Sequence, residues 1–469
     1  MERFGAQGVT FIVSIVLARI LDPKVYGVVA LVTVFTSILQ VFIDSGFGSS
    51  LIQKKDADDL DFSSVFYFNI VICLFLYLVV FFCAPLIAKF YNMPDLTPIV
   101  RVVSLILIIS GVKNVQQAYV SRNFLFKKFF FATLGGTIGA AVVGIVMAVL
   151  GFGVWALVAQ MLFNMTVDTI ILWITVKWRP KKQFSLERLK VLFSYGWKLL
   201  VAALVDTGYN QIRHLIIGKK YTAEDLAFYN KGDRLPNLLV ININSAIDSV
   251  IFPSMSAEQD NVDRVRNMTK RAIKVSSFVM WPLMIWLGVC APTLIGLVLT
   301  DKWLPCVPFM RVFCFTYAFW PIHTANLNAI KALGRSDSFL KIEVLKKVIG
   351  FAILMSTMWF GVRIIAYGLI LETFVSLVAN TVPTKKLLQY GVLSQIKDIF
   401  PYIALGAFMG GVVFVIQLLP IHRVIVIITQ LFLGIFIYLI GSKIFRFDSY
   451  EYIMDIIKSY VGKIRNKEE

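Results

Sequence analysis

Two short segments of the chain, QVFIDSGFGSSLI and NSAIDSVIFPSMS, each place an Ile-Asp-Ser sequence among apolar residues. Their carboxylates, Asp44 and Asp248, recur about 200 residues apart. A charge at the centre of a bilayer costs about 3 kcal/mol on insertion scales, so a charged residue there is usually retained for a structural or functional reason. Two interpretations remain open: a structural contact at a helix end, or a site that couples a proton or a cation to transport.

Other ionisable and amide residues lie inside or at the ends of apolar segments. In GWKLLVAALVDTGYNQIRHLIIG, Asp206 and Arg213 are seven residues apart and therefore lie on one helix face, where they can flank a common cavity. Snorkelling to the membrane surface is the alternative for Lys198 and Arg213. The other predicted substrate-binding residues are Lys113, Lys331, Asn210, Asn242, Asn244 and Gln116, and the other predicted coupling or gating residues are Asp168, Asp206 and Glu372.

Sequence motifs of known enzymes are missing from the chain. It has no GxxxxGK[ST] phosphate loop, no HExxH and no GxSxG, and its three histidines lie far apart in sequence. Its five cysteines form no CxxC pair and are interpreted as buried apolar residues. We therefore predict no catalytic residues, no metal site and no cofactor, and energy for transport would come from an ion gradient, a partner or product consumption.

The composition is that of a membrane protein. Of 469 residues, 58% are hydrophobic and only 16% are charged, and the mean hydropathy is +0.77. Apolar segments of about 20 residues recur throughout and are predicted to be helices, because lipid offers no partner to the backbone. About fourteen spans are predicted, at residues 5–20, 27–48, 64–88, 98–119, 130–150, 153–176, 197–217, 233–254, 274–298, 307–330, 341–360, 364–383, 399–419 and 423–443.

The net charge of +18 is distributed unevenly over the predicted connections. Basic residues gather in alternate loops, such as those with Lys54, Lys128 and Lys182, whereas the opposite loops hold fewer, such as Lys24 and Lys89. This is the positive-inside pattern, and it predicts that both termini are cytoplasmic. The positive charge therefore indicates membrane topology, and nucleic acid is not a predicted partner.

Weak internal repeats accompany the two Ile-Asp-Ser segments. ILDPKVYG (20–27) matches AEDLAFYN (223–230), and FGVWALVA (152–159) matches FGVRIIAY (360–367), in the same order. The predicted fold is an all-α polytopic membrane protein with two pseudo-symmetric six-helix lobes plus two C-terminal helices. The predicted parts are an N-terminal lobe (1–176), a cytoplasmic interfacial linker (177–196), a C-terminal lobe (197–388), two further helices (389–445) and a cytoplasmic amphipathic tail (446–469).

Two amphipathic segments are predicted at the cytoplasmic surface. In the linker, Ser185 is a predicted N-cap, followed by apolar residues at helical spacing. In the tail, one face carries the apolar residues Tyr450, Ile453, Ile457, Tyr460, Val461 and Ile464. A solvated tail is the alternative.

Three segments resemble the polysaccharide biosynthesis, Wzx-type flippase family of the multidrug, oligosaccharidyl-lipid and polysaccharide exporter superfamily. They are the opening ERFGAQGVTFIVSIVLARILDPKVYGVVALVTVF, the following DSGFGSSLIQKKD and the later LGFGVWALVAQML. The resemblance implies alternating access and movement of an undecaprenyl-pyrophosphate-linked oligosaccharide across the bacterial cytoplasmic membrane. It also implies a role in lipopolysaccharide, O-antigen, capsule or exopolysaccharide synthesis, beside a polymerase and glycosyltransferases as partners. Family members usually begin before the ERFGAQG-like segment, so Met1 is expected to be a miscalled or truncated start.

Two other functions are alternatives to a flippase. A cation-coupled multidrug exporter of the same superfamily would depend on acidic cavity residues rather than basic ones. A membrane-embedded glycan polymerase or ligase would need a sizeable outer loop with reactive residues, and the predicted outer connections are about a dozen residues or fewer.

Overall fold

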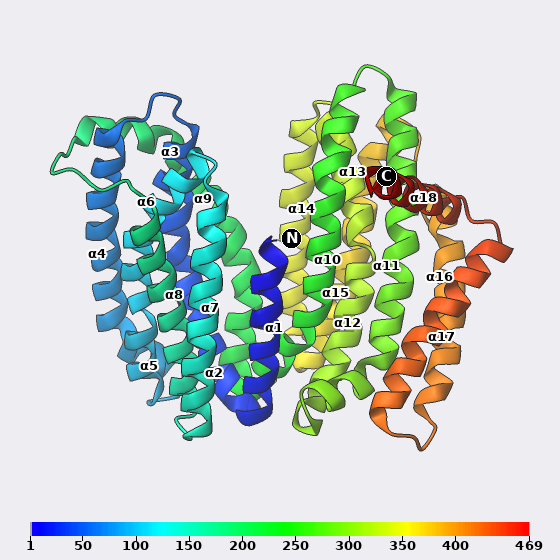
Figure 1. The fold of residues 1–469 in the computed structure, drawn as a ribbon, viewed down its shortest axis with the longest axis horizontal. Helices are drawn as coiled ribbons and strands as arrows, with labels where there is room; N and C mark the ends of the chain where they lie inside the picture. The colour runs from blue at the N-terminus through cyan, green and yellow to red at the C-terminus, as the bar shows by residue number, and fades with distance from the viewer. Residues whose placement is uncertain (1, 469) are drawn as a thin grey trace. The chain divides into compact units, whose positions relative to one another are not determined.

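The computed structural model is built of helices (Figure 1). It describes residues 2–468, and the side chains in that range except those of residues 2–7, 45, 46, 126, 195, 456 and 460–468. Within the described range no residue is in a strand, which confirms the predicted all-α class. Internal contacts divide the chain into unit 1 (Met1–Ala227) and unit 2 (Phe228–Glu469).

Unit 1 contains a series of long helices joined by short connections. In chain order its elements are α1 (Glu2–Ile20), α2 (Pro23–Ile43), the π-helical turn η1 (Asp44–Gly48), α3 (Ser49–Gln53), α4 (Asp59–Tyr91), α5 (Leu96–Val103), α6 (Leu105–Arg122), α7 (Phe126–Val149), α8 (Val154–Thr175) and α9 (Leu186–Lys220).

Unit 2 also consists of long helices joined by short connections. Its elements are α10 (Ala223–Ala257), which begins just before the boundary, α11 (Val262–Val298), the 3₁₀ turn η2 (Asp301–Cys306), α12 (Val307–Ala318), α13 (Trp320–Ala332), α14 (Ser336–Thr357), α15 (Val362–Leu388), α16 (Val392–Gln417), α17 (Arg423–Ile444) and α18 (Asp448–Glu468).

The internal repeat predicted from the sequence has structural counterparts. Both units contain a long helix (α4, α11) followed by a broken one, which is interrupted at Ser104 between α5 and α6 and at Phe319 between α12 and α13. The two FGV segments also take equivalent places, because Gly153 and Gly361 directly precede α8 and α15. Both glycines have positive φ, 55° and 107°, a conformation that a side chain would strain.

All fourteen predicted spans are helical, and ten helices of the described chain are long and apolar enough to cross a membrane. The chain is therefore a multi-pass membrane protein. Four predicted spans correspond to helices that do not meet the same standard of length and apolarity. They are 5–20 (α1), 197–217 (α9), 307–330 (α12 with α13) and 341–360 (α14). The count of fourteen spans stays a prediction.

Helix α9 is continuous from the predicted linker into the predicted seventh span. Ser185 is its N-cap, as predicted, and its side chain accepts a hydrogen bond from the Arg188 backbone N–H at 3.4 Å. Further along, α9 packs closely on α2, because a Cβ on Gly218 would lie 2.1 Å from Leu31 Cδ2. The predicted lobe boundary at residue 197 falls inside this helix, and the division into lobes stays a prediction.

An aromatic and charged cluster holds together the end of unit 1 where α4 begins. Phe62 and Trp178 pack with ring centroids 5.7 Å apart, and Asp61, fully buried, pairs with Lys54 at 2.6 Å. Asp58 caps α4 with a reciprocal capping box. The Asp61 backbone N–H and the Arg188 guanidinium help to hold the pKa of the Asp58 carboxyl below its usual value. These contacts hold the connection between α3 and α4.

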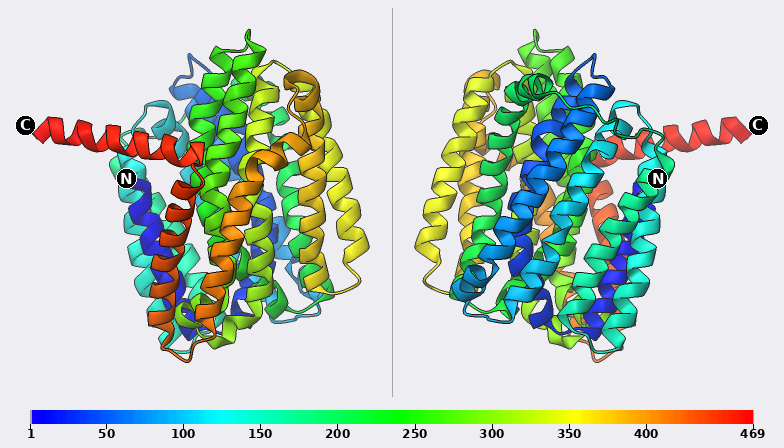
Figure 2. Two further views of the ribbon diagram at one scale, coloured as in Figure 1. Left: turned by 90° about the vertical axis from the view of Figure 1, so that its right-hand side faces the viewer. Right: turned by 90° about the vertical axis from the view of Figure 1, so that its left-hand side faces the viewer.

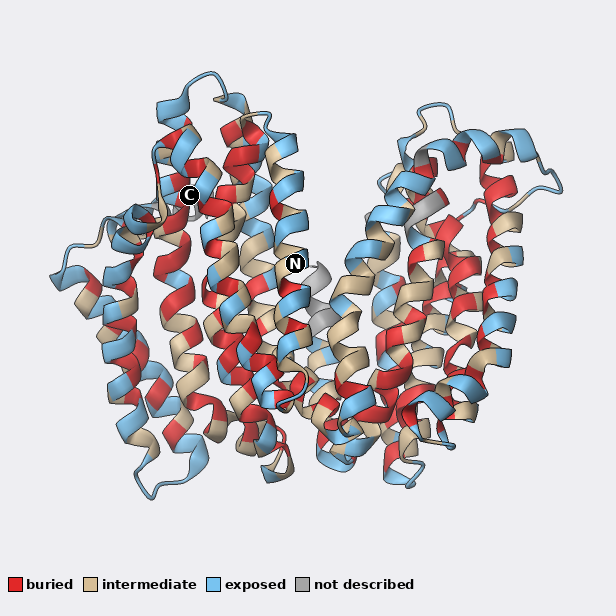
Figure 3. Ribbon diagram, turned by 180° about the vertical axis from the view of Figure 1, so that it is seen from behind, coloured by how far each residue is buried: buried red, intermediate tan, exposed pale blue. Residues whose placement is uncertain are grey.

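Buried residues gather inside each unit, and exposed ones cover the connections and outward helix faces (Figure 3). Helix α18 runs away from the other helices of unit 2, across the direction of α16 and α17 (Figure 2). Its first turn is anchored where Asp448 pairs with Lys274 at 2.8 Å and Ser449 hydrogen-bonds with Tyr402 at 2.8 Å. The predicted apolar face of the tail includes Tyr460, Val461 and Ile464, which lie outside the described side chains.

Candidate functional site

The regular helix α2 ends one residue before Asp44, where the backbone widens into the π-helical turn η1. Turns of this type are frequent at functional sites, because they change the direction in which side chains project. The Asp44 carboxylate accepts hydrogen bonds from the Gln40 amide at 3.2 Å and from Asn114 Nδ2 on α6, also at 3.2 Å. Gly48 leaves room for Asn114, since a Cβ there would lie 3.1 Å from Asn114 Oδ1.

A second amide extends this network into the packed interior of unit 1. Asn69 on α4 donates to Asn114 Oδ1 at 3.4 Å, and both side chains are buried. The two helices approach closely at this level, because a Cβ on Gly111 would lie only 2.6 Å from Cys73 Sγ. The orientation of Asn114 is therefore set from two sides before it contacts the carboxylate.

Next to Asn114, Lys113 forms a buried ion pair with Asp168 on α8. Each side chain retains only 10% of its accessible surface. The Lys113 ammonium also lies 3.7 Å from the Met165 sulfur. Burying two charges is costly unless they stay paired, so each residue depends on the other.

These groups surround a cavity of about 410 Å³, which we call the unit 1 polar pocket. Its wall combines hydroxyls, amides, one carboxylate and one ammonium with a few apolar residues: Thr33, Thr36, Ser37, Gln40, Asp44, Ile106, Ser110, Lys113, Gln117, Met161 and Met165. The buried Ser110 hydroxyl has no hydrogen-bond partner among the described residues. The described part of the chain also contains no group of acidic, His and Cys residues arranged to hold a metal. The polar side chains can hydrogen-bond the hydroxyls or amides of a ligand, while most of the accessible wall is apolar.

Unit 2 repeats the carboxylate and amide contact in simpler surroundings. Asp248 lies within the regular helix α10, and Asn328 Nδ2 on α13 donates to it at 2.6 Å. Lys331, one turn further along α13, is exposed and lies over the rings of Phe252 and Phe339, 5.3 and 5.6 Å from their centroids. The structure thus places Asp248 and Lys331 on adjacent helices.

The structure distributes the remaining predicted residues over separate places. Gln116 is fully buried and donates to the Trp178 carbonyl at 3.2 Å, outside the pocket wall. Asn210 donates to Asp206 one turn earlier on α9, at 3.3 Å, and Asn242 donates to the carbonyl of Leu238 in its own helix at 2.8 Å. The others lie on helices without a described polar pocket: Lys198 and Arg213 on α9, Asn244 on α10 and Glu372 on α15.

Sequence reasoning missed a buried polar cluster in unit 2. Tyr317 on α12 donates its hydroxyl to Asp233 on α10 at 2.5 Å, and Asn237 donates to the same carboxylate at 3.1 Å. Asp233 is the first residue of the predicted span at 233–254, and neither Asp233 nor Tyr317 is among the predicted site residues. Also missed were Asn69 and Asn114, because isolated amides in apolar segments give no pairing signal.

The fold and the buried polar groups define a class, the polytopic helical membrane proteins with polar sites inside the membrane-spanning body. Residues 16–308 match the family model described as polysaccharide biosynthesis protein, which is more than half of the chain. The chain therefore belongs to the polysaccharide biosynthesis protein family, as its sequence resemblance predicts.

Named relatives agree with this family. The teichuronic acid biosynthesis protein TuaB of Bacillus subtilis is 26% identical over 64% of this chain and 63% of its own length. The succinoglycan biosynthesis transport protein ExoT of Rhizobium meliloti is 24% identical over 65% of this chain and 61% of its own. The lipopolysaccharide biosynthesis protein WzxC of Escherichia coli is 23% identical over 72% and 69%. The matches to TuaB and ExoT thus span less than two thirds of those proteins.

Solved structures show the same fold over nearly the whole chain. The lipid II flippase MurJ in an inward closed conformation covers 95% of this chain, with 97% of its own length aligned, at a TM-score of 0.76 and 13% identity. An inward-facing multidrug resistance MATE transporter of the MOP superfamily covers 84%, with 95% of its own length aligned, at a TM-score of 0.64 and 16% identity. The fold is therefore shared with both kinds of transporter.

Proposed function

We propose that this protein is a flippase that moves an undecaprenyl-pyrophosphate-linked oligosaccharide across the bacterial cytoplasmic membrane by alternating access. The observation that carries the proposal is the unit 1 polar pocket, whose hydroxyl and amide side chains can hydrogen-bond a glycan, in a chain of the polysaccharide biosynthesis family. The names of the relatives support a substrate on the way to a cell-surface polysaccharide, such as lipopolysaccharide, O-antigen, capsule or exopolysaccharide.

Within the pocket, the residues divide by charge. Thr33, Ser37 and Ser110 offer hydroxyls to the sugar, and Gln40 and Gln117 offer amides. Lys113 faces the same cavity with a charge that Asp168 balances, so it donates hydrogen bonds without leaving a net positive site. The roles of the other predicted residues remain proposals. They are substrate binding for Arg213, Lys198, Lys331, Asn210, Asn242, Asn244 and Gln116, and coupling for Asp206 and Glu372.

The protein acts in this proposal as a transporter and not as an enzyme. The longest connection between consecutive helices of the described chain is residues 176–185, which leaves little room for an external catalytic loop. That argues against a glycan polymerase or ligase. We place both termini in the cytoplasm from the positive-inside pattern, and we propose that a polymerase and glycosyltransferases work beside the protein.

The test is the leaflet distribution of labelled undecaprenyl-linked oligosaccharide in cells with and without the gene. The proposal predicts that the labelled lipid accumulates on the cytoplasmic leaflet when the gene is absent, and that the gene restores its exposure on the outer leaflet. An unchanged distribution would contradict it.

A cation-coupled exporter of small cationic compounds is the second candidate. It is favoured by Asp44, which lines the pocket and has no ion-pair partner within 4.0 Å among the described residues, and by the fold shared with a multidrug transporter. Under this alternative, deleting the gene lowers resistance to cationic compounds and leaves the labelled lipid where it was.

A further inference from the structure

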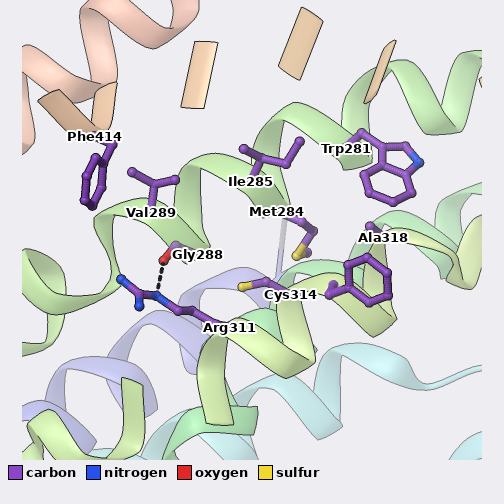
Figure 4. Close-up of a pocket in the computed structure, with 10 residues that line it drawn as sticks. Trp281, Met284, Ile285, Gly288, Val289, Arg311, Cys314, Ala318 and Phe414 are labelled. Carbon is purple, nitrogen blue, oxygen red and sulfur yellow. Dashed lines mark hydrogen bonds between the residues drawn. The ribbon is translucent and has the colours of Figure 1, made fainter. Parts of the chain in front are cut away.

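A groove in unit 2 combines an apolar wall with a single charge. It lies between α11, α12 and α16, has a volume of about 370 Å³, and is lined by Trp281, Met284, Ile285, Gly288, Val289, Arg311, Cys314, Phe315, Ala318 and Phe414 (Figure 4). A volume in this range is typical of sites for small ligands. Apart from Arg311, its side chains offer almost nothing polar to an occupant.

The guanidinium of Arg311 is only partly satisfied. Its Nε donates to the Gly288 carbonyl at 3.1 Å, which holds the guanidinium beside Gly288, on the side of the groove away from Trp281 (Figure 4). Neither an ion pair nor a second hydrogen bond of this side chain is found among the described residues. Two helices that form the groove, α11 and α16, are apolar enough to span a membrane, and a charge in such surroundings normally has a partner. Because Arg311 is exposed, its free Nη groups are open to an anion from the surroundings.

The wall of the groove restricts what that anion can be. Ile285, Val289 and Phe315 line the same groove as Arg311 with apolar side chains, and Phe414 on α16 is 45% exposed. A free inorganic anion would leave this surface uncovered, whereas a lipid would cover it with an acyl chain. The arginine fork binds phosphate with two parallel hydrogen bonds, and its Nη groups are available for this.

We propose that this groove binds an anionic phospholipid of the bilayer, with its phosphate on the Nη groups of Arg311 and an acyl chain along Ile285, Phe315 and Phe414. The site is separate from the unit 1 polar pocket and does not depend on the transported substrate. It makes the folded state of unit 2 sensitive to the anionic lipid content of the membrane, because a ligand that binds only the folded form stabilises it.

The test uses the full-length protein in detergent, freed of lipid and titrated with phosphatidylglycerol, with bound lipids counted by native mass spectrometry. The proposal predicts one tight site for phosphatidylglycerol, and about tenfold weaker binding at that site after Arg311→Gln. The matched control is Arg363→Gln, because Arg363 is an exposed arginine at the start of α15 and does not line the groove. That variant is expected to bind like the wild type.

A second variant tests the acyl chain separately from the charge. Val289→Trp fills the groove and keeps Arg311, so it is expected to reduce binding of long-chain phosphatidylglycerol as strongly as Arg311→Gln. Equal phosphatidylglycerol binding by the wild type and both variants would overturn the proposal. Displacement of the lipid by millimolar inorganic phosphate would show an anion site without a lipid, and preference for undecaprenyl phosphate over phosphatidylglycerol would assign the groove to the substrate. Either result would also overturn it.

Discussion

The carboxylates of the two Ile-Asp-Ser segments occupy different surroundings in units 1 and 2. Asp44 begins a π-helical turn, accepts hydrogen bonds from two amides and lines a cavity beside the buried Lys113 and Asp168 pair. Asp248 lies in a regular helix and has one amide partner, Asn328. The contact between a carboxylate and an asparagine on the facing helix is common to both units, and Asp44 in addition lines the unit 1 polar pocket.

This difference separates two roles that the sequence leaves open. The shared amide contact joins neighbouring helices in each unit, which is a structural role. The π-helical turn, the second amide and the cavity go beyond that role, and they support our proposal that the transport site lies in unit 1. We therefore expect substitutions around Asp44 to affect transport and substitutions around Asp248 to affect mainly local packing.

The largest predicted effect comes from the buried ion pair. Lys113→Met leaves Asp168 charged and buried without its partner, so we expect the unfolding free energy to fall by about 3 kcal/mol or more. The comparison in unit 2 is Lys331→Met, which removes an exposed lysine held by cation–π contacts and is expected to cost less than about 1 kcal/mol. Thermal unfolding of the purified protein in detergent measures both.

A double variant distinguishes pairing from packing. Adding Asp168→Leu to Lys113→Met removes the uncompensated charge, and most of the lost stability should return. A Lys113→Met variant as stable as the wild type would contradict the buried pair.

A smaller effect is expected from the close approach of α4 and α6. Gly111→Ala would place a Cβ 2.6 Å from Cys73 Sγ, and overpacking of this kind costs about 1–3 kcal/mol. The control is Gly208→Ala on α9, where no atom lies within 4 Å of the new Cβ, and it should stabilise the protein by about 0.5 kcal/mol or more. The two alanine variants should therefore shift the unfolding temperature in opposite directions, and a shift in the same direction would argue against the tight contact.

The smallest predicted effect concerns the attachment of α18 in unit 2. The contact with Lys274 lowers the pKa of Asp448 from its usual value of 3.8, so the ion pair stabilises the folded state above about pH 4 and the contribution disappears as the pH falls through the lowered pKa. Because Asp448 is largely exposed, Asp448→Asn should cost less than about 0.5 kcal/mol at pH 7. Unfolding curves should therefore differ between the two proteins at pH 7, and the difference should vanish only at a pH below the lowered pKa of Asp448.

Much of the fold follows from hydropathy and local signals. Every predicted span is helical, and Ser185 caps α9 as expected, because both depend on neighbours in the sequence. The candidate site is harder to predict. Asp44, Lys113 and Asp168 were each selected as charged residues in apolar segments, but their arrangement depends on helices that are distant in the sequence. A pair such as Lys113 with Asp168 leaves no local pattern.

Backbone irregularity also escaped the sequence reasoning. The π-helical turn at Asp44–Gly48 packs against α6, where a Cβ on Gly48 would lie 3.1 Å from Asn114 Oδ1. The polar cluster of Asp233 and Tyr317 likewise joins α10 to α12. In both cases the decisive contact is tertiary, and composition or periodicity cannot reveal it.

The most direct test of the account compares the two carboxylates in the transport assay. Cells that lack the gene would carry the wild type, Asp44→Asn or Asp248→Asn at equal membrane levels, and the exposure of labelled undecaprenyl-linked oligosaccharide on the outer leaflet would be followed over time. We expect Asp44→Asn to slow transport about tenfold, the loss of roughly one charge-assisted interaction, and Asp248→Asn to slow it less than about twofold. Equal rates for the two variants, or a larger defect in Asp248→Asn, would contradict the assignment of the functional site to unit 1.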